Sequence, residues 1–308
     1  MNNLQIIRLC MVCYTLLCMG CTTEQPVEEN ITAPIQKGRI DGILQHQGQQ
    51  RTYILYIPDS YTGNEVVPLV FNFHGYTSNA ETIMTYSGLR QLADTEGFIV
   101  VYPQGSLYQG STHWNVGGWT TGSTVDDVGY TEELIDQLIN DYAIDPLKIY
   151  STGMSNGGYM SFLLACQLSD RIAAVASVTG SMTPETYGNC DPQHPTPVLQ
   201  IHGTADVVVP YEGAYWTSAI EEVLGYWAQY NGCNPTATSE LLPDKMTNDG
   251  SVVERWVYAE GERRVHVEHL KVIGGGHDWP GSWGNMDIDT ATEIWSFLSI
   301  YDLNGRIE

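Results

Sequence analysis

Short apolar runs alternate along this chain with longer segments in which apolar residues recur every three or four positions. Four of the short runs lie at residues 66–73, 98–102, 148–152 and 197–202. Helical spacing is clear at residues 134–139, where Leu or Ile occupies positions 134, 135, 138 and 139. Strand-like runs that alternate with helical segments predict the α/β class, a mostly parallel central sheet covered by helices.

The alternation continues from about residue 38 to the end without repeats or a second linker. Residues 38–308 are therefore predicted to form one domain. In parallel sheets of this kind, functional sites form at the carboxyl ends of the strands. Chemistry-bearing residues that directly follow an apolar run are the ones to examine first.

The first twenty residues differ from the rest. A single positive charge, Arg8, precedes an apolar run at 9–19 that is too short to span a bilayer and is typical of a signal peptide. The run ends at Gly20 and Cys21, an arrangement that resembles a bacterial lipoprotein signal with the lipid on Cys21. An ordinary cleaved secretory peptide is the alternative. Residues 21–37 are polar and predict a tether, so the protein is expected to be exported, anchored to the cell envelope or else secreted or periplasmic.

The charge of the chain excludes several classes of partner. Its 308 residues include 13 Lys and Arg against 36 Asp and Glu, a formal net charge of −23. Such a surface repels nucleic acid and anionic lipid, which leaves a lipid anchor as the expected membrane contact. The aromatic residues are 19 Tyr and 8 Trp against 5 Phe, an excess that favours aromatic surface with its polar tips in water.

Three cysteines lie beyond the predicted signal and its lipid site: Cys166, Cys190 and Cys233. An exported chain permits one disulfide and one thiol among them, but the sequence does not say which pair forms. No Cys or His spacing indicates a zinc site, so no metal is expected.

The strongest chemical signal is the G-x-S-x-G motif at residues 153–157, centred on Ser155. A predicted strand precedes it and a helical segment follows at 159–168. This context suits a strained turn that lifts a serine hydroxyl above the sheet, with glycines where the backbone must pass closely. Ser155 is the predicted nucleophile; the alternative is an inert serine in a glycine-rich turn.

A serine nucleophile needs a base, and the base needs an acid that orients it. Asp206 follows the apolar run 197–202, and His277 follows three glycines after the run 267–273, in the chain order expected for this architecture. The competing candidates are His74, His202, His266, His269 and Asp278. The N–H groups of Asn156 and Tyr76 are the predicted oxyanion donors, and His74 is expected to brace the loop that carries Tyr76.

With these motifs in place, the chain resembles the secreted polyhydroxybutyrate depolymerase-like esterases, a group that includes feruloyl and acetylxylan esterases of the first carbohydrate-esterase family. The matching motifs lie at residues 125–130, 153–158, 202–206 and 274–281. The resemblance extends from about residue 38 to 301, and implies an α/β-hydrolase fold, a Ser-Asp-His triad and no cofactor.

The chain departs from its apparent relatives in two ways. They often carry a cysteine in the segment written here as 256–260, as partner to the one at Cys233, and this chain lacks it. Cys233 is therefore free or pairs with Cys190 or Cys166. The predicted lipid anchor is the second departure, because many relatives are freely secreted.

Other residues near the motifs have two interpretations. Trp114, Trp119, Trp279 and Trp283 lie in loops near motif ends. They are either buried plugs or a stacking surface for sugar rings or aromatic acyl groups, which makes them candidate substrate-binding residues. Asp126 and Asp127 precede a helical segment, where capping and pairing with the helix dipole is the preferred interpretation. The alternative for Asp127 is that it braces the loops of the site.

The sequence thus predicts an exported serine carboxylesterase that works through an acyl-enzyme. Its expected substrates are feruloyl or acetyl esters of plant polysaccharide such as xylan, with short-chain polyhydroxyalkanoate as the alternative. A non-catalytic glycan-binding surface lipoprotein, or a peptidase or acyltransferase with the same triad, are alternatives from other classes. The ester, the oligomeric state and the disulfide pairing stay open.

Overall fold

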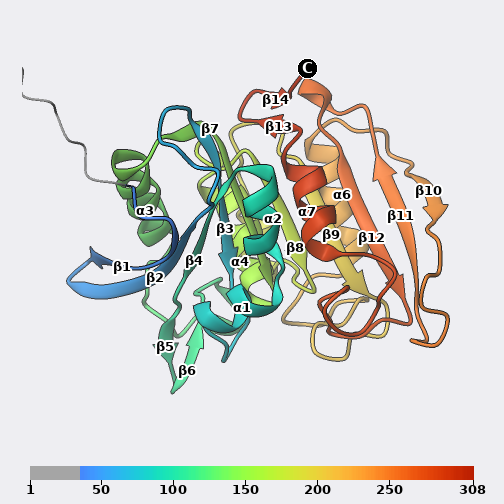
Figure 1. The fold of residues 1–308 in the computed structure, drawn as a ribbon. Coiled ribbons are helices and arrows are strands. Elements are labelled where there is room, and N and C mark those ends of the chain that lie inside the picture. The colour runs from blue at the N-terminus through green and yellow to red at the C-terminus, as the bar shows by residue number, and fades with distance from the viewer. Residues whose placement is uncertain (1–34) are drawn as a thin grey trace, which may run out of the picture. The chain divides into compact units, whose positions relative to one another are not determined.

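Ten strands form one sheet at the centre of the protein, shown in Figure 1. The computed structural model describes residues 35–308, which form one compact unit. The strands lie in the order β1, β2, β4, β3, β7, β8, β9, β12, β11, β10. Their bounds are β1 Gly38–His46, β2 Gln49–Ile57, β3 Val67–Phe73, β4 Ile99–Pro103, β7 Ile144–Met154, β8 Ala174–Val178, β9 Val198–Gly203, β10 Thr238–Leu241, β11 Val252–Tyr258 and β12 Val267–Ile273.

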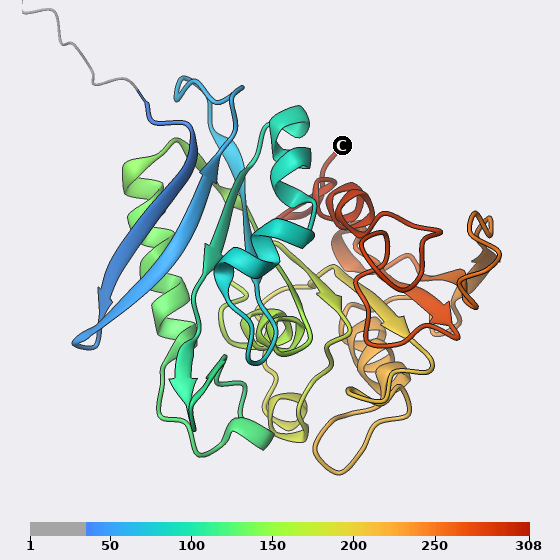
Figure 2. The same ribbon diagram turned by 60° about the horizontal axis from the view of Figure 1, so that its bottom comes forward.

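The six central strands, from β4 to β12 in that order, pair in parallel. The two strands at each edge pair antiparallel. Because parallel strands all end at the same edge of the sheet, the loops that follow β3, β7, β9 and β12 gather there. Figure 2 brings this edge of the sheet forward.

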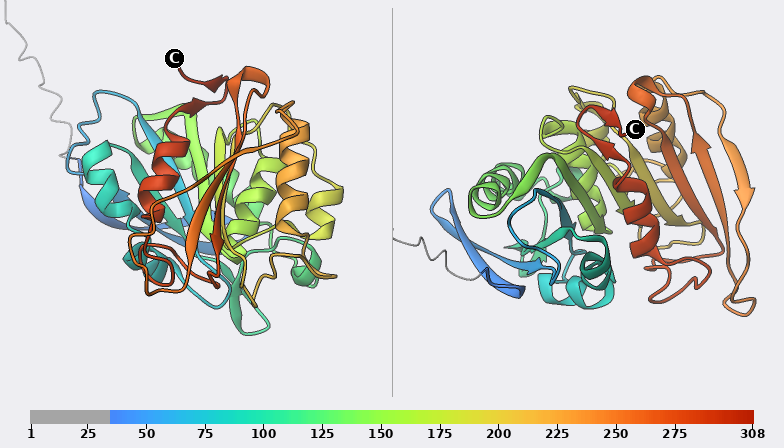
Figure 3. Two further views of the ribbon diagram at one scale, coloured as in Figure 1. Left: turned by 90° about the vertical axis from the view of Figure 1, so that its right-hand side faces the viewer. Right: turned by 45° about the horizontal axis from the view of Figure 1, so that its top comes forward.

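Helices cover both faces of the sheet, as Figures 1 and 3 show. On one face, α3 (Asp127–Asp141), α4 (Asn156–Gln167) and α6 (Ile220–Tyr230) bury their apolar sides against the strands. On the other face lie α1 (Ala80–Tyr86), α2 (Leu89–Glu96) and α7 (Thr290–Leu298). Two apolar cores result, one on each side, and together they fix the sheet as a rigid platform.

Short elements complete the structure at the ends of the sheet. They are the hairpin β5 (Ser106–Tyr108) and β6 (Ser111–His113), the pair β13 (Tyr301–Asp302) and β14 (Gly305–Arg306), helix α5 (Pro184–Gly188), and the 3₁₀ turns η1 (Gly118–Thr120) and η2 (Glu262–Arg264). No helix within residues 35–308 combines the length and apolarity needed to cross a bilayer.

The predicted mostly parallel sheet flanked by helices is confirmed, and β12 spans the predicted run at 267–273. The prediction missed the hairpin of β1 and β2. In β1 exposed residues alternate with partly buried ones, because the strand lies at the edge of the sheet, and such a strand has no continuous apolar run. The predicted signal at 1–20, the lipid site Cys21 and the tether up to residue 34 lie outside the described residues.

Candidate active site

Ser155 lies at the turn between β7 and α4, at the carboxyl edge of the sheet. Its backbone has φ 54° and ψ −118°, a conformation that side-chain-bearing residues rarely adopt. The turn is held by the Ser155 N–H, which donates to the carbonyl of Val178 at 2.8 Å. The result is a strained, half-buried serine presented above the sheet, the arrangement that the G-x-S-x-G motif predicts.

The loop after β3 packs directly against this turn. A Cβ at Gly157 would lie 1.9 Å from the carbonyl oxygen of Phe73, so only glycine allows the first turn of α4 to come so close. A Cβ at Gly75 would lie 3.6 Å from the Cβ of Ser155. The backbone around Gly75 therefore lies within van der Waals reach of the serine.

Both predicted oxyanion donors are placed beside Ser155. Asn156 is the first residue of α4, where a backbone N–H has no acceptor inside the helix. Tyr76 follows Gly75 in the loop after β3, and its N–H has no acceptor within residues 35–308, although the neighbouring Thr77 and Ser78 both donate. Among residues 35–308, the two residues next to Ser155 and next to Gly75 therefore each carry an N–H without a hydrogen-bond acceptor.

Asp206 and His277 come together across 71 residues of sequence, with Asp206 Oδ2 2.7 Å from Nδ1 of His277. The other carboxylate oxygen accepts the N–H groups of Val208 and Val209, each at 2.8 Å. Burial alone would raise the pKa of Asp206, but the hydrogen bond and charge of His277 and the Val209 N–H outweigh it and lower that pKa below its usual value. The carboxylate is thus ionised and fixes the orientation of the His277 ring.

The structure therefore forms the pair of Asp206 and His277 and places Ser155 at the same edge of the sheet. The Ser155 hydroxyl has no hydrogen-bond partner within the described residues. Such contacts are often loose without substrate and tighten when substrate binds.

The competing histidines are buried or held by other hydrogen bonds. His74 Nδ1 donates to the Gly75 carbonyl at 2.7 Å while Nε2 accepts the Gly105 N–H at 3.0 Å, so this ring braces the loop. Burial lowers the pKa of His74 and of His202 to about 4 and that of His269 to about 3.

The other competitors are engaged as well. His202 Nε2 lies 2.9 Å from the Val209 carbonyl and 3.4 Å from Oδ2 of Asp206, so this fully buried ring borders the carboxylate. His266 forms hydrogen bonds with Glu268 and Tyr301. The Asp278 carboxylate accepts the backbone N–H of Gly276, whereas the His277 ring pairs with Asp206.

The structure corrects the stacking role for two of the four tryptophans. Trp114 and Trp279 are buried to within 1% of their surface, so neither can offer a ring face to a substrate. Trp114 instead donates its indole N–H to the His74 carbonyl at 2.9 Å, as a plug behind the loop. Trp119 is half-buried, and Trp283 is exposed and packs edge-on against Tyr86.

The two aspartates before α3 have different roles. Asp126 caps the helix by accepting the Gly129 N–H, as predicted. Asp127 is buried; it pairs with Arg51 at 2.6 Å and accepts the Asn115 N–H at 2.7 Å. Asp127 lies in the first turn of α3, where pairing with the helix dipole is expected, and it also braces the loop that carries Trp114, which is the alternative interpretation.

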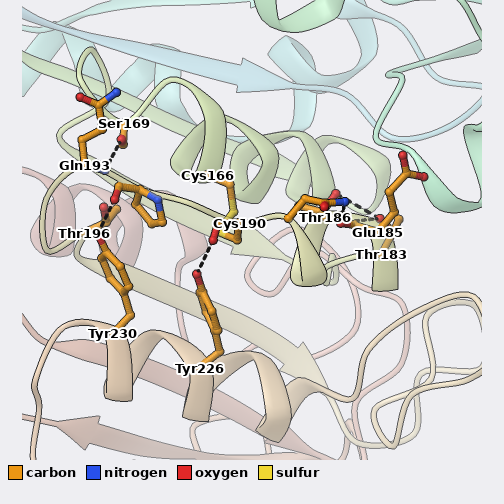
Figure 4. The surroundings of a disulfide bond; sticks show 12 residues. Cys166, Ser169, Thr183, Glu185, Thr186, Cys190, Gln193, Thr196, Tyr226 and Tyr230 are labelled. Atoms are coloured by element: carbon orange, nitrogen blue, oxygen red, sulfur yellow. Dashed lines mark hydrogen bonds between the residues drawn. A yellow bond between two sulfur atoms is a disulfide. The ribbon is translucent and has the colours of Figure 1, made fainter.

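Cys166 and Cys190 form a disulfide, and Cys233 is a half-buried thiol that has no disulfide partner among residues 35–308. Figure 4 shows that the bond joins the end of α4 to the segment after α5, where Tyr226 of α6 donates its hydroxyl to the Cys190 carbonyl at 3.2 Å. The sequence left this pairing open, because it gives no distances between the three cysteines.

A cavity of about 780 Å³ lies beside the site and includes residues that the sequence interpretation missed. Its lining consists of Gly118, Trp119, Pro184, Glu185, Tyr215 and Trp216. The aromatic pair at positions 215 and 216, in a loop between a predicted strand and a helix, was the available signal. Within residues 35–308, no cluster of three or more His, Cys, Asp or Glu side chains is arranged to hold a metal ion.

Comparison with known proteins supports the resemblance. Residues 51–193 match the family described as esterase PHB depolymerase. The chain is 28% identical over 87% of its length to the bifunctional acetylxylan esterase/xylanase XynS20E of Neocallimastix patriciarum, of which it spans 36%. It is 31% identical over 74% of its length to feruloyl esterase B of Piromyces equi, of which it spans 42%. The chain thus spans less than half of these two relatives.

Solved structures show the same fold. An acetyl xylan esterase from Aspergillus awamori aligns with a TM-score of 0.61 over 84% of this chain and 99% of its own, at 17% identity. Thermogutta terrifontis esterase 2 aligns with a TM-score of 0.56 over 85% and 91%, at 13% identity. The predicted α/β-hydrolase fold is confirmed.

Proposed function

From its confirmed resemblance to the polyhydroxybutyrate depolymerase-like, feruloyl and acetylxylan esterases, we propose that this chain is a serine carboxylesterase. The single observation that supports this most is the hydrogen bond between Asp206 and His277, at the same edge of the sheet as the strained Ser155. The proposed substrates are feruloyl or acetyl esters of plant polysaccharide, with xylan first.

The proposed reaction starts with proton transfer. His277 takes the Ser155 proton on Nε2 while the serine oxygen attacks the ester carbonyl, and the buried carboxylate of Asp206 stabilises the imidazolium that forms. The carbonyl oxygen becomes an oxyanion, which accepts hydrogen bonds from the N–H groups of Tyr76 and Asn156. Because these donors are fixed by the β3 loop and the start of α4, they need little reorganisation as charge develops.

The intermediate then collapses. The bond to the alcohol breaks, His277 returns its proton to the leaving oxygen, and the acyl group stays on Ser155. Water attacks this acyl-enzyme with His277 again as base, which releases the acid and restores the serine. The acyl-enzyme splits one difficult displacement into two easier steps.

A polyhydroxyalkanoate depolymerase is the second candidate. Besides the description of the matching family, one observation favours it. Val207 and Val208, directly after Asp206, are 89% and 53% exposed. Apolar side chains that stand free at the rim of a site suit contact with an apolar polyester.

The proposal includes export from the cytoplasm. Disulfides persist in oxidising compartments, and the bond between Cys166 and Cys190 fits such a location. Attachment through Cys21 would hold the enzyme at the cell envelope.

Replacing the serine tests the activity. Wild type is expected to hydrolyse p-nitrophenyl acetate, and Ser155→Ala should reduce kcat/KM by roughly 10⁴-fold or more. Ser299→Ala, at the end of α7, is the matched control and should keep the wild-type rate. If wild type and Ser155→Ala are equally inert, the protein is not this esterase, and that result would favour a non-catalytic glycan-binding role.

A substrate panel separates the two candidates. Methyl ferulate, acetylated xylan and a hydroxybutyrate oligomer should be compared by kcat/KM under one condition. Preference for the first two supports the proposed substrates. Hydrolysis of the oligomer alone would overturn them.

A further inference from the structure

Three segments at the carboxyl edge of the sheet line the open cavity of about 780 Å³. Gly118 and Trp119 belong to η1, Pro184 and Glu185 begin α5, and Tyr215 and Trp216 lie in the loop between β9 and α6. We name this cavity the aromatic cleft. Its volume is typical of a binding site and exceeds what one small acyl group fills.

The aromatic cleft adjoins the proposed catalytic groups. The Trp119 ring packs edge-on against Tyr76, at 5.6 Å between centroids, and against Tyr159, at 6.0 Å. Tyr76 carries one of the proposed oxyanion donors, and the N–H of Tyr159 donates to the carbonyl of Ser155 at 3.0 Å. Tyr215 and Trp216 lie in the same loop as Asp206, between β9 and α6. One wall therefore contacts the oxyanion loop and the other continues from the carboxylate.

The lining combines flat apolar surface with a carboxylate. Trp119 and Trp216 pack edge-on at 6.5 Å between centroids, and the Tyr215 side chain is 96% exposed. Glu185 uses Oε2 to accept the Gly118 N–H at 2.8 Å. Its Oε1 has no partner within the described residues, so one carboxylate oxygen is left to accept a hydrogen bond from a ligand.

This combination selects a class of ligand. Sugar rings present C–H faces that pack on the electron-rich faces of aromatic rings, and hydroxyls that donate to a carboxylate. An anionic ligand is disfavoured by the Glu185 charge and by a net charge of −23. A polyester chain carries only hydrogen-bond acceptors and would leave the Glu185 carboxylate unmatched.

The openness of the cleft indicates which side of the ester it receives. A buried slot would suit an aromatic acyl group, whereas Tyr215 stands almost entirely in solvent. An open cleft suits a polysaccharide chain that extends beyond the site on both sides. We propose that the aromatic cleft binds the neutral sugar rings on the alcohol side of the scissile ester, an inference that rests on the proposed esterase function.

Kinetics on matched substrates test the assignment. In Trp216→Ala and Tyr215→Ala, KM for an acetylated xylo-oligosaccharide should rise about tenfold relative to KM for methyl ferulate, with kcat little changed. Leu241→Ala removes a side chain of β10 that is 65% exposed and should leave both substrates unaffected. A loss confined to methyl ferulate would place the acyl group in the cleft, and equal losses on both would mean a structural effect; either overturns the proposal.

A binding measurement that needs no hydrolysis provides the second arm. Unesterified xylotriose should bind wild type and Ser155→Ala alike, detected by titration calorimetry and by tryptophan fluorescence. Affinity should fall about tenfold in Trp216→Ala. Failure of xylotriose to bind wild type would overturn this proposal even if esters are hydrolysed, whereas absent hydrolysis of every ester would overturn the proposed function itself.

Discussion

The carboxylate of Asp127 joins three separate segments at a single buried point. It pairs with Arg51 of β2, accepts the N–H of Asn115 and begins α3. Arg51 also lies over the Tyr130 ring, 4.0 Å from its centroid. Removing one member of such a group leaves a charge buried without its partner, which costs more than the pair itself contributes.

Asp127→Asn should therefore lower the free energy of unfolding by about 3 kcal/mol, because Arg51 is only 4% exposed and its charge would stay buried without an anionic partner. Asp126→Asn is the matched control: asparagine caps helices as well as aspartate does, so its effect should stay within about 0.5 kcal/mol. Equilibrium urea unfolding measures both. Similar losses in the two variants would contradict the role given to Asp127.

Residues that follow a strand directly could be placed from the sequence, since each strand end has a local signal. Ser155, Asp206 and His277 were predicted in this way, and in the structure the last two are joined by a hydrogen bond. The burial of Trp114 and the partners of Asp127 depend on contacts between distant segments, which no local pattern records. The carboxylate of Glu185 was missed for the same reason.

The disulfide acts at the scale of elements. It ties the end of α4 to the segment that follows α5, across 24 residues of sequence. Helix α5 in turn holds the loop before η1, because the hydroxyls of Thr183 and Thr186 both donate to the Val116 carbonyl at 3.1 Å. The bond therefore supports the wall of the aromatic cleft as well as the end of α4.

Replacing both Cys166 and Cys190 with serine should lower the free energy of unfolding by about 3 kcal/mol, the loop-closure entropy that the cross-link removes from the unfolded chain. Cys233→Ser, which changes a thiol outside the bond, is the control and should cost less than about 1 kcal/mol. Denaturant unfolding with and without reductant distinguishes the cases. Reductant should weaken wild type and leave the double variant unchanged; equal stability of the two proteins would contradict the prediction.

The outer strands show why elements differ in predictability. The central strands are buried on both faces and read as apolar runs, so β3, β4, β9 and β12 were found within about two residues of their ends. The strand β10 is exposed along its whole length and pairs only with β11. Its stability comes from its neighbour rather than from its own side chains, so its sequence carries no strand signal.

At the scale of the whole molecule, three buried histidines make the free energy of unfolding depend on pH. Burial lowers the pKa of His74 and His202 to about 4 and of His269 to about 3, so all three are neutral in the folded protein near neutral pH. In the unfolded chain each would take up a proton near its usual pKa of about 6.5. The unfolded state therefore binds more protons as the pH falls between these values.

The free energy of unfolding should accordingly fall as the pH is lowered from about 6.5 to 4, by up to roughly 1.4 kcal/mol per pH unit for each histidine. Urea unfolding at pH 7.5, 6.5 and 5.5 measures this, and the interval from 7.5 to 8.5 should be nearly flat as an internal control. Equal stability at pH 7.5 and 5.5 would contradict the assignment of these rings as neutral and buried.

The requirement for glycine at position 157 has a consequence for searches of other genomes for active esterases of this kind. Any larger residue there would displace the Phe73 carbonyl and with it the loop that carries Tyr76. A chain could then keep its serine, aspartate and histidine and still have lost the proposed oxyanion donor at Tyr76. Under the proposed mechanism, screening by the triad alone would count such chains as enzymes, and adding the position of Gly157 would separate them.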